Sequence, residues 1–317
     1  MQKGWFDKYF TAIKVMIMLC AYAYLVYMLV TFKHYDQLPA VWNHLSAHRW
    51  GYLAAAVVLW LANWGIETCK WQTLLTQLQP LSFLSSLKSV FIGITTGFFT
   101  PNRIGETAGR ALLLQDGNRI QGMTLTLVGA VAQNFTSLLF GFSAIMGTVL
   151  WELNTDKLQY TALAVIIGCF IGFASLYFTL PLWGKRLLHI TWLKKITPYV
   201  QAALSIPYST LIKVTLLSMA RYVVYCLQFY LLLLFFGVQL APNMALILIP
   251  LHYLAVSFTP SIAFSEVGIR GAFAGFIIGG VGAVLASISV WCLNYVFSMM
   301  VGSILLLCTK KTINVKQ

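Results

Sequence analysis

Long apolar runs constrain this chain more than any other feature of its sequence. A bilayer core of about 30 Å is crossed by a helix of about 20 apolar residues. Six runs reach that length, at approximately residues 10–32, 51–77, 120–150, 158–180, 210–237 and 281–307. The apolar residues follow one another without the alternation of a membrane β-strand, which argues against a β-barrel. The sequence therefore predicts an all-α polytopic membrane protein.

Composition and charge distribution support this class. The chain has 317 residues, of which 59% are hydrophobic and 9% charged, with a formal net charge of +13. A basic balance of this size can indicate nucleic-acid binding, but here the cations lie in short loops between apolar segments. That distribution is typical of the positive-inside rule and of contact with anionic lipid. We therefore expect one membrane domain over residues 1–317, with no nucleic acid as a partner.

The loop cations also predict the orientation of the chain. Thirteen Lys and Arg residues fall in the N-terminus, the loop near 70–88, the segment 181–213 and the C-terminus. The loops at 33–50 and 151–157 hold only three. By the positive-inside rule the first group is cytoplasmic, which places both termini of a multi-pass inner-membrane protein in the cytoplasm. This parity requires the remaining regions to cross the membrane an even number of times.

Residues 82–116 and 241–279 are the two regions that no single span explains. Each holds two shorter apolar segments divided by a Thr-Pro pair, Thr100-Pro101 in the first and Thr259-Pro260 in the second. Residues 104–115 would make about 18 Å of helix at 1.5 Å per residue, which is too short to cross. We therefore expect two re-entrant helical hairpins, the first entering from the cytoplasm and the second from outside.

The two hairpin regions also resemble each other. A shift of 159 residues superimposes the Thr-Pro pairs and, without a gap, the helices that precede them. Each pair is followed by a Glu-xxx-Arg sequence, Glu106 to Arg110 in the first region and Glu266 to Arg270 in the second. Because the hairpins enter from opposite sides, we interpret the halves, about 1–157 and 158–317, as an inverted repeat. Inverted repeats with broken helices at mid-membrane are typical of transporters.

The hairpins hold the first candidates for a binding site. Proline lacks an N–H and favours the first turn of a helix, so Pro101 and Pro260 are expected to end one half-helix and open the next. The N-terminus of the new helix, with Arg103, Arg110 and Arg270, would then offer donors to a phosphate. The alternative is that each Glu and Arg pair, in the favourable i to i+4 order, neutralises itself and only holds its hairpin.

Polar residues inside the predicted spans extend this set. Glu67 and Asn63 lie one helical turn apart, and we expect Glu67 to line the cavity or to pair with a hairpin arginine. Arg221 either snorkels to the interface or joins the cavity. Asn134 is interpreted as an interhelical hydrogen-bonding residue. His252 could relay protons, but we interpret it as a packing residue. The predicted substrate-binding residues are Pro101, Arg103, Glu106, Arg110, Pro260, Glu266, Arg270, Glu67, Asn63 and Arg221.

Motifs of enzymes and cofactors are not found in the sequence. There is no His or Cys spacing for a metal, no nucleophile elbow and no nucleotide-binding loop. We therefore expect no catalytic residue, no metal and no cofactor, and a transporter rather than an enzyme.

The hairpin motifs resemble a known family. FTPNRIGExxGRALLL, from Phe99, and SFTPSxxxSEVGIRGAF, from Ser257, resemble the lysylphosphatidylglycerol synthase transmembrane region, also called the flippase-like domain family. The helices GIETCKWQTLL and RYVVYCLQFYLLLLFFGV look like the family's flanking helices, so the resemblance covers almost the whole chain. The second motif departs from the family pattern, because residues 261–265 read SIAFS where a glycine-rich stretch is usual.

This resemblance implies a lipid flippase. In fused members the region moves a lipid between leaflets, and a soluble C-terminal domain makes aminoacyl-lipid. We expect a stand-alone member without that domain, because the chain stops at Gln317 just after the last apolar run. The expected function is transport of an anionic, phosphate-bearing lipid or lipid-linked precursor between leaflets.

Two other functions and two protein partners also follow from the sequence. The first alternative is a membrane-embedded enzyme acting on a lipid phosphate, and the second is an accessory subunit of a lipid- or envelope-synthesis complex. Besides lipid, the expected partners are a second copy in a homo-oligomer or a separate lipid-synthesis enzyme.

Overall fold

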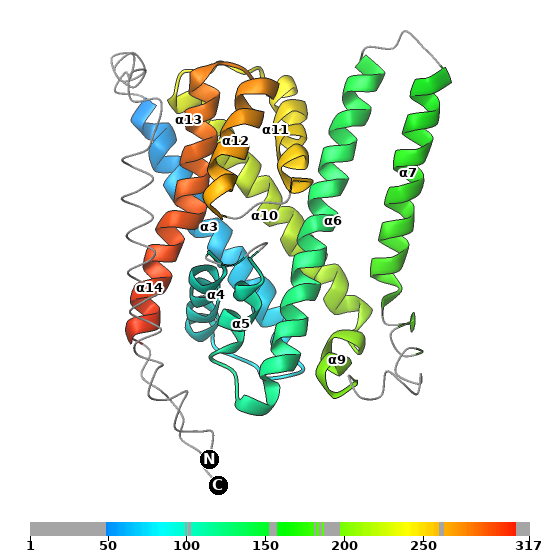
Figure 1. Ribbon diagram of the computed structural model, residues 1–317, viewed down its shortest axis with the longest axis vertical. Coiled ribbons are helices and arrows are strands. Elements are labelled where there is room, and N and C mark those ends of the chain that lie inside the picture. The colour runs from blue at the N-terminus through cyan, green and yellow to red at the C-terminus, as the bar shows by residue number, and fades with distance from the viewer. Residues whose placement is uncertain are drawn as a thin grey trace.

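The computed structural model describes residues 49–98, 100, 103–151, 157–180, 182–183, 186, 197–259 and 263–308. Regular structure within these ranges is entirely helical, as Figure 1 shows. The elements are α3 (Trp50–Leu75), α4 (Phe83–Phe98), α5 (Gly105–Ala111), η4 (Asp116–Asn118), α6 (Arg119–Trp151), α7 (Lys157–Phe178), α9 (Thr197–Leu204), α10 (Tyr208–Phe235), α11 (Pro242–Ser257), α12 (Ala263–Ile277), α13 (Gly280–Trp291), η6 (Cys292–Phe297) and α14 (Ser298–Cys308).

Four helical runs in the described ranges are long and apolar enough to cross a membrane. They are Trp50–Leu75, Asp116–Thr148, Tyr208–Phe235 and Gly280–Cys308, and each agrees with a predicted span to within a few residues. The prediction of an all-α polytopic protein is thereby confirmed. The predicted span at 158–180 is helical as α7, and the one at 10–32 lies outside the described residues.

Two pairs of shorter helices occupy the regions predicted as hairpins. α4 and α11 have 16 residues each, or about 24 Å of helix, less than the thickness of a bilayer core. α4 packs against α5, and α11 packs against α12. In Figure 1, α4 and α5 lie in the lower half of the molecule, while α11 and α12 lie in the upper half. The predicted helix at 104–115 was too long, because α5 ends at Ala111 after seven residues.

Helices α3 and α10 pack along each other through the middle of the molecule (Figure 1). Apolar side chains hold this arrangement, with Trp71, Leu75 and Leu211 fully buried in one cluster. α6 contacts α5 in one half of the chain and α10 and α11 in the other. Through α3, α6 and α10 the two short-helix pairs therefore share a common interior.

Glycines let α5 lie directly on α4. A Cβ atom at Gly93 would come 2.6 Å from Cγ of Arg110, and one at Gly97 would come 2.9 Å from Cβ of Glu106. Both distances are below any normal carbon–carbon contact, so a larger residue would push α5 away. The two glycines thus determine where Glu106 and Arg110 stand.

One π-helical turn interrupts the last helical run, which the sequence predicted as a continuous span at 281–307. The turn, η6, covers Cys292–Phe297 between α13 and α14. Such turns place an extra residue in the helix and are frequent at functional sites. Here the turn contains Asn294 and Tyr295, whose side chains reach the site described below.

Candidate functional site

The carboxylate of Glu67 is the centre of a buried charge cluster on α3. Its Oε1 accepts a hydrogen bond from Nη2 of Arg110 at 2.7 Å. Its Oε2 lies 2.8 Å from Nη1 of Arg221 and 2.7 Å from Nζ of Lys70. The side chains of Glu67 and Lys70 are each only 2% exposed. A carboxylate buried so deeply is tolerated only when it is paired, and Glu67 has three cationic partners.

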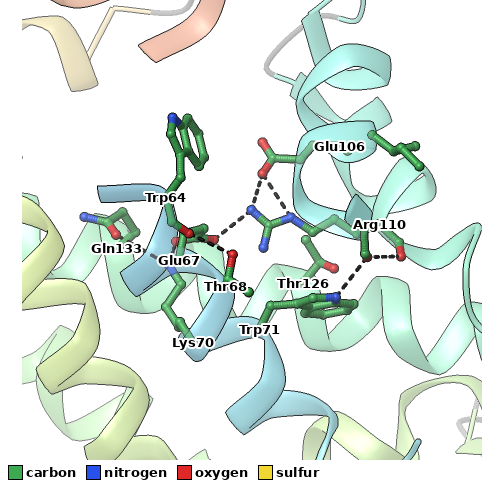
Figure 2. Close-up of polar contacts among 12 residues, drawn as sticks. Trp64, Glu67, Thr68, Lys70, Trp71, Glu106, Arg110, Thr126 and Gln133 are labelled. Carbon is green, nitrogen blue, oxygen red and sulfur yellow. Dashed lines mark hydrogen bonds and ion pairs between the residues drawn. The ribbon is translucent and has the colours of Figure 1, made fainter. Parts of the chain in front are cut away.

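Arg110 joins this cluster to the first short-helix pair, as Figure 2 shows. Its Nε lies 3.1 Å from Oε1 of Glu106, one turn earlier on α5, and its Nη2 donates to the same oxygen while also reaching Glu67. The Arg110 carbonyl accepts a hydrogen bond from the Ser89 hydroxyl at 2.6 Å, and Ser89 accepts one from Nε1 of Trp71 at 3.0 Å. Both the side chain and the backbone of Arg110 are therefore fixed.

Glu266 on α12 organises a second cluster, which connects the two short-helix pairs. Its Oε1 accepts hydrogen bonds from Nε and Nη2 of Arg270 at 2.9 and 2.7 Å. Its Oε2 accepts one from Nη2 of Arg103 at 2.6 Å. Arg103 also stacks on an aromatic face, with its Cζ 3.5 Å from the ring centroid of Tyr295. These contacts bring together residues from both halves of the chain.

Arg103 reaches this position through an unusual backbone conformation. Its φ of 58° is the single positive φ of a non-glycine residue among those described. Left-handed backbone of this kind is uncommon and persists where surrounding contacts impose it. Here the ion pair with Glu266 and the stack on Tyr295 are such contacts.

A chain of side-chain amides orients Arg221 from the far side of the cluster. Nε of Arg221 donates to Oδ1 of Asn63 at 3.0 Å. Nδ2 of Asn63 donates to Oδ1 of Asn294 at 2.7 Å, and Nδ2 of Asn294 donates to Oε1 of Gln228 at 2.6 Å. Gln228 closes the chain by donating to the carbonyl of Ala56. Each amide in this series accepts a hydrogen bond from the preceding residue and donates one to the next. The series therefore fixes the orientation of the Arg221 guanidinium.

Both clusters line one cavity of about 390 Å³. This size falls in the range of about 300–1,000 Å³ that is typical of ligand pockets. The indole N–H of Trp64 and the hydroxyls of Tyr225 and Tyr253, in residues of its wall, have no hydrogen-bond partner among the described residues. Buried polar groups are nearly always paired, so these three unpartnered groups set the cavity wall apart from ordinary helix packing. Within the described ranges, no group of three or more His, Cys, Asp or Glu side chains could hold a metal ion.

Comparison with known protein families identifies the family of this chain. The model described as the lysylphosphatidylglycerol synthase TM region matches residues 12–302. The chain belongs to this family. It is accordingly a multi-pass membrane protein, and no aminoacyltransferase domain is detected in its 317 residues. No curated protein and no solved structure matches the chain.

In this lysylphosphatidylglycerol synthase TM region, most of the sequence-predicted site residues lie together. The ones in the wall of the cavity are Asn63, Glu67, Arg103, Glu106, Arg110, Arg221 and Arg270. Glu266 binds two of these arginines, and the expected pairing of Glu67 with a hairpin arginine is present as its bond to Arg110. Pro101 and Pro260 lie outside the described residues.

The start of α5 is capped by the chain itself. The N–H of Gly105 donates to Oγ1 of Thr100 at 2.8 Å. The first helical N–H is therefore already used, and α5 is only seven residues long. The donors for an anion are therefore expected to be the side chains of Arg103 and its neighbours rather than the N–H groups of the helix N-terminus.

Several residues of the site were not in the predicted set. Lys70 was counted among the loop cations, but it lies inside α3 and bonds to Glu67 and Gln133. Its i to i+3 spacing from Glu67 was the available signal. Asn294 is a polar residue inside the predicted span at 281–307, which was also an available signal. Tyr295 gave none, because the π-helical turn that directs it inward has no recognisable sequence pattern.

The structure agrees with the interpretation of His252 but not with that of Asn134. His252 is fully buried between aromatic rings, 5.1 Å from Phe229 and 5.2 Å from Tyr253 between centroids, as a packing residue would be. Its Nε2 lies 3.3 Å from the Ser287 hydroxyl. Asn134, interpreted as an interhelical hydrogen-bonding residue, is instead an exposed residue of the cavity wall.

Proposed function

We propose that this protein moves an anionic, phosphate-bearing lipid between membrane leaflets, with the headgroup held in the central cavity. The observation that carries this proposal is an imbalance of charge. Among the described residues, five cations line the cavity, Lys70, Arg103, Arg110, Arg221 and Arg270. Three carboxylates bind them, Glu67, Glu106 and Glu266.

An excess of two positive charges inside a membrane is unfavourable unless an anion balances it. Unpaired charges in a low-dielectric interior cost several kcal/mol each, and intramembrane ionisable groups therefore mark binding sites and pathways. Arginine forks fit phosphate oxygens in a bidentate geometry. An anionic headgroup is the ligand that this cavity favours.

The exposure of the cations separates structural from accessible positions. Lys70 and Arg110 are 2% and 5% exposed and are held by Glu67. Arg103 and Arg221 are 29% and 18% exposed, the most accessible cations of the cavity. We assign headgroup contact to these two, while Lys70 and Arg110 hold the helices together.

Helix boundaries support the proposed inverted repeat. α11 begins at Pro242 and ends at Ser257, and each boundary lies 159 residues after that of α4, at Phe83 and Phe98. The same shift was found between the two Thr-Pro pairs in the sequence. The opposite ends at which these helices lie in Figure 1 are in keeping with hairpins that enter from opposite sides. Such pairs could alternate access to a fixed central site.

We further propose an inner-membrane location with both termini in the cytoplasm. Because Lys70 is buried in α3, it no longer counts as a loop cation. Twelve cations remain in the segments assigned to the cytoplasm, against three in the loops at 33–50 and 151–157. The positive-inside argument therefore keeps its direction.

Translocation in vesicles tests this function. Purified protein would be reconstituted with a trace of acyl-labelled fluorescent phosphatidic acid or phosphatidylglycerol, and an impermeant quencher would report the outer leaflet. We expect protein-dependent exposure of the inner-leaflet probe, slowed about tenfold or more in Arg103→Gln and Arg221→Gln. Arg119→Gln is the matched control, because that arginine pairs with Asp116 and is 37% exposed. Equal rates for protein-containing and empty vesicles would refute the proposal.

A further inference from the structure

The excess charge of the cavity is divided between its two clusters. The cluster around Glu67 has two carboxylates, Glu67 and Glu106, and three cations, Lys70, Arg110 and Arg221. It therefore carries one net positive charge.

The second cluster repeats this balance with different residues. It has one carboxylate, Glu266, and two cations, Arg103 and Arg270. It too carries one net positive charge, and both clusters face the same cavity. The site thus offers two single positive charges at separate places rather than one concentrated charge.

We infer that the cavity selects a lipid whose headgroup carries two negative charges, a phosphomonoester or a diphosphate, bound between Arg103 and Arg221. This inference rests on the proposed function and names its substrate class. A phosphodiester with one negative charge would leave one cluster uncompensated. A phosphomonoester carries between one and two negative charges at neutral pH and presents three acceptor oxygens.

Arg103 and Arg221, the two accessible arginines, have similar contacts that position them to bind a headgroup. Arg103 stacks on Tyr295, and Arg221 has its Cζ 5.0 Å from the ring centroid of Trp64. Each also bonds to a carboxylate that has at least one other cationic partner, Glu266 for Arg103 and Glu67 for Arg221. Either arginine can therefore turn toward a headgroup without leaving its carboxylate unpaired.

Unpartnered polar groups also lie in residues of the cavity wall. Tyr253 and Trp64 are 6% and 3% exposed, and their polar hydrogens have no acceptor among the described residues. Trp64 lies beside Arg221, and Tyr253 packs on Tyr225 with ring centroids 5.0 Å apart.

Competitive binding to the full chain tests the inference. Protein in phosphatidylcholine nanodiscs would be titrated with short-chain phosphatidic acid and with phosphatidylglycerol of the same acyl chains, using tryptophan fluorescence as the readout. We expect phosphatidic acid to bind about tenfold more tightly. Inorganic phosphate, titrated alone, should bind far more weakly than phosphatidic acid. Equal affinity for inorganic phosphate would overturn the assignment to a lipid.

Charge variants locate the selectivity. Arg103→Gln and Arg221→Gln each remove one excess charge, so the preference for phosphatidic acid should fall to about threefold or less in either variant. Arg103→Lys and Arg221→Lys keep the charge and should restore most of the preference, which separates a charge effect from misfolding. An unchanged preference in both glutamine variants would overturn the two-cluster assignment.

The possible failures of the two proposals are distinct. If the wild-type protein translocates both lipids but binds phosphatidylglycerol at least as tightly, the dianion inference is wrong and the flippase function stands. If it neither binds nor moves either lipid, the proposed function itself is wrong.

Discussion

Arg103 and Glu266 connect the two short-helix pairs through one ion pair of 2.6 Å, across 163 residues of sequence. Glu266 keeps Arg270 as a second partner at 2.7 Å. The Arg103 bond can therefore be exchanged for a bond to a ligand without leaving a bare carboxylate in the membrane. A contact that both holds the halves together and can be released at low cost suits a protein that must open on alternate sides.

Removing the charge of Glu266 should disable transport. In Glu266→Gln, Arg103 and Arg270 lose the carboxylate that they share, which leaves a buried and a partly buried guanidinium group with only neutral partners. We expect lipid translocation in vesicles to fall by about tenfold or more. Asp116→Asn serves as the control, because Asp116 is 65% exposed and its ion pair should contribute little. Transport at the wild-type rate in Glu266→Gln would mean that the second cluster has no role.

Glu67 should matter most for stability. Its replacement by Gln would leave Lys70, Arg110 and Arg221 without the carboxylate that pairs with all three. Breaking a buried ion pair typically destabilises by about 3–5 kcal/mol, so the melting temperature of purified Glu67→Gln should fall clearly. The double variant Glu67→Gln with Lys70→Met removes one of the uncompensated cations and should recover part of the loss. Thermal unfolding monitored by tryptophan fluorescence measures both, and equal melting temperatures for wild type and Glu67→Gln would contradict this role.

Gly93 should be intolerant of even one methyl group. In Gly93→Ala the new Cβ would meet Cγ of Arg110 at 2.6 Å and displace α5 from α4. We expect lower thermal stability and slower translocation together, because Arg110 and Glu106 both move. Gly65→Ala on α3 is a matched control, since nothing lies within 4 Å of its added Cβ. Alanine there should be neutral or stabilise the helix by up to about 1 kcal/mol. Similar behaviour of the two variants would rule out the close-contact explanation.

The aromatic face of Tyr295 should contribute to headgroup binding by holding Arg103. Tyr295→Phe keeps the ring under the guanidinium, whereas Tyr295→Leu removes it. Cation–π contacts contribute about 0.5–2 kcal/mol, so the leucine variant should bind phosphatidic acid about 2- to 30-fold more weakly than the phenylalanine variant. Titration in nanodiscs gives the ratio, and equal affinities for the two variants would exclude a role for the ring.

The sequence predicted the long helices and most of the charged site for identifiable reasons. The apolar runs are long enough to determine spans by length alone, and charged residues such as Glu67 and Arg221 stand out inside them. The Glu-xxx-Arg pairs were predictable because a helix brings residues four apart together.

The parts that the sequence did not predict depend on tertiary packing. Lys70 was counted as a loop cation although the predicted span at 51–77 contained it, and the structure shows it buried inside α3, which continues five residues beyond it to Leu75. The bond from Arg103 to Glu266 joins segments whose approach no local pattern specifies. Asn294 and Tyr295 point inward through a π-helical turn, which depends on the packing of α13 and α14 rather than on a sequence motif.

Native mass spectrometry of the lipid that co-purifies with the protein tests the central claim most directly. Wild type and Arg119→Gln should both retain a phosphate-bearing lipid that is enriched over its share in the bulk membrane. The double variant Arg103→Gln with Arg221→Gln should lose that lipid while remaining folded by melting temperature. Retention of the same lipid by the folded double variant, or no enrichment of any anionic lipid in wild type, would contradict a headgroup site in this cavity.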